Sequence, residues 1–299
     1  MNAPDALPGG GETVIESMKA PKPQLSVIVV VYNMPKHARR TLQSLHPGYQ
    51  RGMSQGDYEV IVVDNRSSPP VDRGTIESFG SNFRLVSIAN APRSPARAIN
   101  HGVARARGDM LAIMIDGARL ASPGILRQAL LARALHPRPI IATLSWHLGP
   151  GMQGDTKDGG YDEATEDGLL ESVRWPEDGY RLFAISALAG SYLGGWFSPL
   201  VESCCLLLGR EPFAELGGYD ERFDYPGGGL VNPDFFARAC SLPDVQPIVL
   251  LGEGTFHQMH EGATSVRPRS ERAEEFRRWN EQYARLRGKR YSPPPIDAW

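Results

Sequence analysis

The stretch that decides the fold is 25-LSVIVVV-31, and two similar runs follow it, 58-YEVIVVD-64 and 110-MLAIMID-116. Each run is almost continuously apolar, and polar sequence begins where it ends. Such runs suit parallel strands that are buried on both faces and joined by helical crossovers. In open α/β sheets, ligands bind beyond the carboxyl ends of the strands, near the point where strand order reverses. Asp64 and Asp116 fall at that edge, so the sequence predicts a nucleotide site there.

Composition narrows the class of protein. The chain has 299 residues, of which 41% are hydrophobic and 22% charged, enough for a sizeable core. A formal net charge of -2 argues against nucleic acid as a partner, because nucleic-acid-binding domains usually carry a basic excess. The three cysteines form neither a disulfide framework nor a zinc spacing. No secretory signal and no apolar run of bilayer length is present, so we expect a cytoplasmic protein.

Capping residues, glycines and prolines divide the chain into predicted elements. Strands are expected over 25–31, 58–63, 83–88, 110–115, 139–145, 201–208 and 246–251, and helices over 35–45, 94–106, 122–135, 164–172, from 232 onward, and 270–287. This order predicts an α/β fold with a mostly parallel sheet flanked by helices. The region 146–198 is irregular and rich in Gly, Asp and aromatic residues, which is typical of a substrate-side segment.

The predicted domain organisation is one large domain between two tails. Residues 1–23, rich in Pro and Gly, are expected to form a disordered leader. Residues 24–265 form the domain, with a nucleotide-binding half over 24–145 and an acceptor half over 146–265. Residues 266–299 are expected to form an amphipathic helix and a tail.

The C-terminal helix is predicted from apolar residues at helical spacing, Phe276, Trp279, Tyr283 and Leu286. It is rich in Arg and Lys, so peripheral contact with an anionic membrane or a partner stays open. We favour a helix docked on the domain with a solvated charged face.

Four segments together resemble family 2 glycosyltransferases: 26-SVIVVVYN-33, 59-EVIVVDNRSS-68, 94-SPARAINHGVARARGD-109 with 113-IMIDGARLASPG-124, and 206-LLLGREPFAELGGYDERF-223. The resemblance spans roughly Leu25 to His260. It implies a GT-A fold, a nucleotide-diphosphate-sugar donor, a divalent metal ion and inversion at the anomeric carbon.

The resemblance also implies a set of donor-binding residues. Val31 and Asn33 would line the nucleoside, and Asp64 would accept the imide N–H of the base. The alternative for Asp64 is a turn residue that binds nearby backbone amides. Arg97 would reach a phosphate and Asn100 would allow close approach, although Arg97 fits an exposed position on a surface helix equally well.

Asp116 occupies the first acidic position of the family's Asp-x-Asp motif, where Mg²⁺ or Mn²⁺ would be held against the diphosphate. The second acidic position is Ala118, so the need for a metal is open, and Arg119 is an alternative source of positive charge. His257 and His260 stand where similar transferases carry a histidine that completes the metal site or touches the diphosphate. The predicted metal ligands are therefore Asp116, His257 and His260.

The chain departs from the family a second time, at the position of the catalytic base. Asn232 stands there, and an amide does not accept a proton at neutral pH. Asp234 is the preferred remaining candidate, with Asp220, Glu221 and Asp224 as further options. Trp196 is kept as a wall of the acceptor site, because aromatic faces are common in sugar-binding clefts.

The predicted function is therefore transfer of a sugar from a UDP-, GDP- or dTDP-linked donor to a carbohydrate or other hydroxyl acceptor, in glycan or glycoconjugate biosynthesis. The alternative is a catalytically silent GT-A domain that binds a nucleotide sugar or a protein partner, motivated by Ala118 and Asn232. A dinucleotide enzyme or sugar nucleotidyltransferase is disfavoured, because no Gly-rich phosphate loop follows the first strand. A homodimer is left open.

Overall fold

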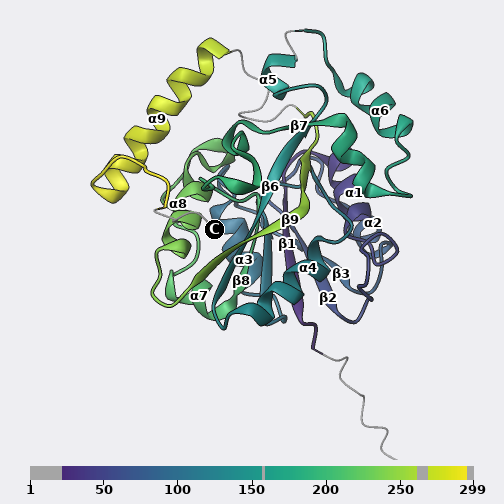
Figure 1. Ribbon diagram of the computed structural model, residues 1–299, viewed down its shortest axis with the longest axis horizontal. Coiled ribbons are helices and arrows are strands. Elements are labelled where there is room, and N and C mark those ends of the chain that lie inside the picture. Colours follow the sequence, from purple (N-terminus) through teal and green to yellow (C-terminus); the bar gives the residue numbers. More distant parts are fainter. Residues whose placement is uncertain (1–21, 157–158, 261–268, 295–299) are drawn as a thin grey trace, which may run out of the picture.

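The computed structural model describes residues 22–156, 159–260 and 269–294, so the predicted leader lies almost wholly outside the described residues. The described part forms a nine-stranded sheet flanked by helices (Figure 1). The strands are β1 (Leu25–Val31), β2 (Tyr58–Asp64), β3 (Phe83–Ser87), β4 (Met110–Met114), β5 (Arg119–Ala121), β6 (Pro139–Leu148), β7 (Ser186–Leu188), β8 (Cys205–Gly209) and β9 (Gln246–His257). The helices are α1 (Pro35–Ser44), α2 (Arg73–Glu77), α3 (Ala96–Val103), α4 (Ile125–Ala132), α5 (Gln153–Thr156), α6 (Glu163–Ser172), α7 (Arg210–Glu215), α8 (Val231–Cys240) and α9 (Arg269–Arg287).

The sheet has the order β3-β2-β1-β4-β8-β6-β9-β5, and β7 pairs with β6 outside this path. Strands β1 to β4 pair in parallel, and β6 pairs in parallel with β9. Strand β8 runs antiparallel between β4 and β6, which leaves the carboxyl ends of β4, β6 and β9 at one edge. Strand order reverses between β1 and β4, so the predicted switch point lies beside the end of β4. The α/β fold with most strands running in one direction is confirmed.

Two hydrophobic layers sandwich the first half of the sheet, because alternate residues of each strand point to opposite faces. On β1, Ile28 and Val30 belong to the layer that contains α3 and α8, whereas Val27 and Val29 belong to the layer that contains α1 and α4. Every residue of β1 and β2 is buried. This explains why these strands could be predicted from continuous apolar runs.

The second half departs more from the sequence prediction. Strand β9 continues past Leu251 to His257, across an irregular register where β6 shifts between Ala142 and Leu144. Strand β8 begins at Cys205 and not at Val201, which leaves 201–204 as a loop at the carboxyl edge. Strands β5 and β7 were not predicted, because three residues carry too little pattern to stand out.

Helix α9 docks on the domain, as predicted, and Figure 1 shows it on the outer side of α8. Tyr283 is buried and packs 6.1 Å from Phe223, measured between ring centroids. Arg287 forms ion pairs with Asp220 and Asp234 at 2.8 and 2.7 Å. Among the described residues, no helix combines the length and the hydropathy that crossing a bilayer requires.

Candidate functional site

The loop that follows β4 presents a carboxylate and a guanidinium as one ion pair. Asp116 Oδ1 accepts a hydrogen bond from the backbone N–H of Ala118 at 3.0 Å, and Arg119 Nε donates to Asp116 Oδ2 at 2.7 Å. Arg119 also reaches β6, donating to Ser145 Oγ at 2.8 Å. Burial opposes the charge of Arg119, but Asp116 and neighbouring acids outweigh it and raise the pKa of the guanidinium. Arg119 is thus a fixed cation at this edge.

The loop has little freedom to move. Thr41 of α1 donates from Oγ1 to the carbonyl of Gly117 at 2.8 Å. A side chain at Gly117 would collide with β1, because a Cβ atom there would lie 2.8 Å from Val31 Cγ2. Asp116 is therefore held at the switch point by close packing of its neighbours.

Two histidines at the end of β9 face Asp116. His257 Nε2 lies 4.0 Å from Asp116 Oδ2 and 3.2 Å from His260 Nε2. The other ring nitrogen of His257, Nδ1, contacts Gln153 Oε1 at 2.6 Å. Because an amide oxygen only accepts, Nδ1 carries the proton and Nε2 keeps its lone pair. Ligand atoms of Asp116, His257 and His260 all lie within 4.8 Å of one another, so the structure brings the three predicted metal ligands together.

The donor set of these three residues suits a divalent transition metal. Burial lowers the pKa of His257 well below its usual value and lowers that of His260, so both rings are neutral and able to ligate. A divalent cation would be held by the Asp116 carboxylate and by ring nitrogens of His257 and His260. One carboxylate with two imidazoles fits Mn²⁺ better than Mg²⁺, which prefers oxygen ligands.

Side chains of α6 and α1 bind the backbone of the segment that follows β9. Glu166 Oε2 accepts from the backbone N–H of Met259 at 2.7 Å, and His37 Nε2 contacts the carbonyl of Met259 at 2.7 Å. Burial raises the pKa of Glu166 to about 8. Figure 1 shows α6 outside α1, where Lys36 and Arg40 form ion pairs with its Asp167. The position of His260 therefore depends on α6.

Several predicted donor-binding residues have structural roles. The Val31 side chain is fully buried in the α1 layer, which corrects the prediction that it lines the nucleoside. Asp64 is 2% exposed, and its oxygens accept from the backbone N–H groups of Ser67 at 2.8 Å and Val71 at 3.1 Å. The turn role considered for Asp64 is the one that the structure shows, and it uses both carboxylate oxygens.

Asn33 and Arg97 keep exposed positions. Asn33 adopts a left-handed backbone (φ 51°) at the rim, where its Oδ1 accepts from the backbone N–H of Ser68 at 2.8 Å. Arg97 is exposed on α3. Their contacts with a donor stay predictions.

Asn100 does not offer close approach to a phosphate, contrary to the prediction. Its Oδ1 accepts from Tyr219 N, and its Nδ2 donates to Tyr219 O and to Glu221 Oε1, each at 2.9 Å. These hydrogen bonds use both ends of the amide and link α3 to the turn before α8.

The prediction for Asp234 also needs correction. Its side chain is fully buried on α8. Arg287 donates to Oδ1 and Oδ2 at 2.7 Å, and Arg238 donates to Oδ2 at 2.9 Å. Both oxygens are bound by guanidinium groups and the side chain has no exposed surface, so an acceptor hydroxyl does not reach it. Asp234 balances charge and does not have the access that a base needs.

Trp196 packs into an aromatic cluster, 5.5 Å from Trp146 and 6.4 Å from Phe183 between ring centroids. Its indole N–H is buried without a partner among the described residues. The neighbouring Phe197 is 81% exposed. A role for Trp196 in acceptor binding stays a prediction.

Sequence reasoning missed Gln153 and Glu202. Gln153 lies on α5 in the irregular region and fixes the tautomer of His257. Glu202 lies in the loop before β8, where its Oε2 accepts from Asn232 Nδ2 at 3.0 Å. No spacing rule links either residue to its partner. For Glu202, a carboxylate directly before an apolar strand was the available signal.

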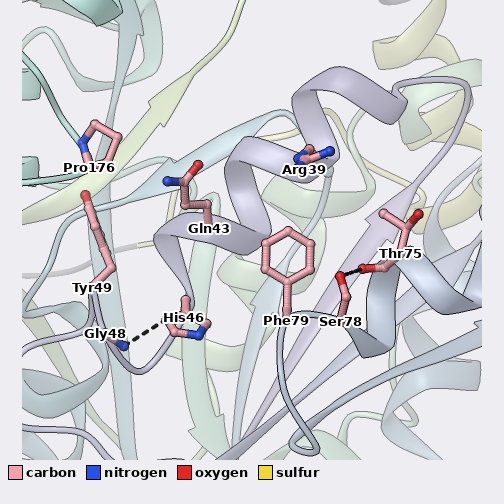
Figure 2. Close-up of a pocket in the computed structure, with 9 residues that line it drawn as sticks. All are labelled: Arg39, Gln43, His46, Gly48, Tyr49, Thr75, Ser78, Phe79 and Pro176. Atoms are coloured by element: carbon pink, nitrogen blue, oxygen red, sulfur yellow. Dashed lines mark hydrogen bonds between the residues drawn. The ribbon is translucent and has the colours of Figure 1, made fainter.

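A separate cavity of about 580 Å³ lies against α1 and α2. Figure 2 shows Arg39 and Gln43 of α1 on one side and Phe79 and Thr75 on the other. None of the predicted site residues lines it. We assign it no ligand.

Fold and site together define a class. The mostly parallel sheet flanked by helices, with its reversal of strand order beside β4, matches a GT-A fold. Residues 26–155 match the protein-family model described as glycosyl transferase family 2. This part of the chain is therefore a family 2 glycosyltransferase domain, and the resemblance found in the sequence is confirmed. Curated proteins gave no significant match.

Solved glycosyltransferases share the fold at low identity. The chain is similar to S. aureus TarS 1–349 in complex with UDP-GlcNAc, with 14% identity and a TM-score of 0.56, covering 87% of this chain and 66% of that one. A second TarS structure has 13% identity and a TM-score of 0.54, and the match covers 79% of this chain and 37% of that one. A third similar structure is the mannosyltransferase PcManGT from Pyrobaculum calidifontis in complex with GDP-Man and Mn²⁺. It has 17% identity and a TM-score of 0.54, and the match covers 92% of this chain and 66% of that one. The chain thus spans less than two thirds of these three structures.

Proposed function

We propose that this protein transfers a sugar from a nucleotide-diphosphate donor to an acceptor hydroxyl, in a single displacement that inverts the anomeric carbon. The observation that carries the proposal is the convergence of Asp116, His257 and His260 at the switch point of a family 2 domain. Solved neighbours were captured with UDP-GlcNAc and with GDP-Man and Mn²⁺, which supports a nucleotide sugar as the ligand. We place the reaction in the cytoplasm, in line with the sequence prediction.

Charge stabilisation of the leaving diphosphate has two sources in this chain. Asp116, His257 and His260 would hold a divalent cation, which supplies positive charge against the diphosphate when bound. Arg119 is the second source, since it is a permanent cation fixed to Asp116 and Ser145. Arg119 stands next to Ala118, the position where the family's second carboxylate is missing. We infer that Arg119 supplies part of the positive charge that a metal ion held by this second carboxylate would otherwise supply.

The first experiment measures thermal stability with UDP, GDP and dTDP, each with and without Mn²⁺, because a ligand that binds only the folded state raises the melting temperature. We expect one nucleotide to raise it, and Mn²⁺ to increase that shift. Asp116→Ala should remove the Mn²⁺-dependent part of the shift. His136→Ala serves as control, because His136 lies before β6 at the opposite edge of the sheet. If no nucleotide shifts the melting temperature, the proposal is wrong.

A second candidate function is a catalytically silent domain that binds a nucleotide sugar or a partner. Ala118 and Asn232 favour it, because they replace a metal ligand and a base of the family. Nucleotide binding without release of nucleotide from UDP-GlcNAc or GDP-mannose would support this alternative.

A further inference from the structure

We infer that Glu202 is the catalytic base of this transferase, placed on the loop before β8 and positioned by Asn232. This inference rests on the proposed function, and it names the residue that deprotonates the acceptor. A catalytic base needs a carboxylate that lies beside the donor site and has one oxygen without a hydrogen-bond partner in the protein.

The position of Glu202 follows from the pairing of β8 with β4. Met114 pairs with Cys205 in antiparallel register. The chain enters β8 from the edge at which β4 ends, so Glu202, three residues before Cys205, lies on the same edge as Asp116. Glu202 is close enough to Arg119 for its charge to contribute to the raised pKa of that guanidinium. Glu202 therefore lies at the edge of the sheet where the proposed donor site is.

Asn232 holds Glu202 in place. Its Nδ2 donates to Glu202 Oε2 at 3.0 Å and to the Ser203 carbonyl at 3.2 Å, and its Oδ1 accepts from Tyr219 OH at 3.2 Å. Asn232 is 4% exposed and its amide is satisfied on both sides. This contact uses Oε2 alone. Within the described residues Glu202 Oε1 accepts no hydrogen bond, and the side chain is half-buried, so one oxygen is available to an acceptor.

The four acids considered earlier as the base all make contacts with other side chains. Asp234 is buried between two arginines. Asp220 is bound by Arg222 and Arg287, Asp224 accepts from Gln282, and Glu221 accepts from Asn100. Glu221 and Asp224 also keep one oxygen that accepts no hydrogen bond within the described structure. What distinguishes Glu202 is its position, because the pairing of β8 with β4 brings it to the edge that carries Asp116.

In the proposed step, Glu202 removes the proton from the acceptor hydroxyl as that oxygen forms a bond to the anomeric carbon of the sugar. The bond from this carbon to the diphosphate oxygen breaks, and its electron pair leaves with the nucleoside diphosphate. The protonated Glu202 then returns its proton to solvent. Water takes the place of the acceptor in hydrolysis of the donor, so the same base is needed there.

The test measures release of UDP from UDP-GlcNAc and of GDP from GDP-mannose, with water as acceptor. We expect Glu202→Gln to lower kcat by about 100-fold or more, the scale of general base catalysis. The melting-temperature shift with UDP or GDP should stay unchanged, because the variant keeps the hydrogen bond to Asn232. Glu211→Gln, an exposed acid on α7, is the matched control.

A double variant makes the test independent of folding defects. Since Asn232 Nδ2 lies 3.0 Å from Glu202 Oε2, Glu202→Gln with Asn232→Asp moves the carboxylate across a single contact. We expect it to recover part of the lost kcat. Full activity in Glu202→Gln overturns the inference and leaves the proposed function intact. Nucleotide binding by the wild type without any release also overturns it, whereas absence of binding overturns the proposed function itself.

Discussion

Gln153 shows how a single side chain decides what a histidine can do. By accepting a hydrogen bond from Nδ1–H of His257, it leaves the lone pair of Nε2 available on the side of Asp116 and His260. Its own Nε2 donates to the His257 carbonyl at 2.8 Å, so ring and backbone are fixed together. Such contacts behind a metal ligand set its tautomer and its basicity.

We therefore expect Gln153→Leu to weaken Mn²⁺ binding by about 10- to 100-fold, the usual cost of losing a partner of a ligating histidine. Isothermal titration with Mn²⁺ in the presence of the bound nucleotide measures this. Gln128→Leu, on the exposed face of α4, controls for a change in hydrophobicity. Equal Mn²⁺ affinity in both variants would contradict the assignment of Gln153.

Asp234 makes a second prediction at the residue scale. Asparagine at this position removes the charge that balances Arg238 and Arg287, and places an amide donor against guanidinium donors. Breaking a buried ion pair by changing one partner costs about 3–5 kcal/mol. We expect Asp234→Asn to lower the free energy of unfolding by about 3 kcal/mol, measured by urea denaturation.

The control for that variant is Asp244→Asn. Asp244 is exposed and has a left-handed backbone (φ 54°), which asparagine adopts readily. Its stability should change little. If Asp234→Asn were equally neutral, the ion pairs of Asp234 would contribute nothing to folding.

At the scale of elements, α3 depends on a glycine. A Cβ atom at Gly102 would lie 2.7 Å from Ile28 Cγ2 and 2.9 Å from Val63 Cγ2, so α3 packs directly on β1 and β2. Overpacking a core in this way typically costs about 1–3 kcal/mol. We expect Gly102→Ala to destabilise the protein by that amount in a urea titration.

Gly168→Ala is the matched comparison on α6. Nothing lies within 4 Å of a Cβ atom at Gly168, which occupies the interior of the helix. Alanine should therefore stabilise the protein by about 0.5–1 kcal/mol, the difference in helix propensity. If Gly102→Ala also stabilised the protein, the packing of α3 on β1 and β2 would not be tight.

The elements also show what a sequence can reveal. Strands β1, β2 and β4 are buried on both faces, so their apolar runs stand out locally. The end of β9 was missed because Gly252 and Gly254 interrupt the pattern while the strand continues to His257. The three residues of the proposed metal site could be named from the resemblance to the family, and the structure brings them together. The roles of Asn100 and Asp234 were not predictable, because they depend on contacts with Tyr219 and Arg287, which are far away in the sequence.

For the whole molecule, Glu166 makes stability depend on pH. Its pKa rises from 4.5 to about 8 on folding, because it is buried. Between these values the folded state binds a proton that the unfolded state has lost, so stability falls as pH rises through this window. The loss of stability across this window is up to about 5 kcal/mol, since one pKa unit corresponds to about 1.36 kcal/mol.

We expect Glu166→Gln to flatten this part of the profile, because the amide oxygen still accepts from Met259 and has no proton to lose. Urea denaturation of both proteins at pH 5, 6.5 and 8.5 measures the difference. The variant should be the more stable protein at pH 8.5. Parallel profiles for the two proteins would show that Glu166 has an ordinary pKa in the folded state.

The ion pairs of Arg287 have a consequence for the order in which this protein assembles. Asp234 lies on α8, but half of its counter-charge arrives with α9, the last helix of the described chain. During synthesis, a nascent chain that has left the ribosome only as far as α8 holds this carboxylate with Arg238 alone. The charge balance around Asp234 is therefore completed only after α9 has left the ribosome.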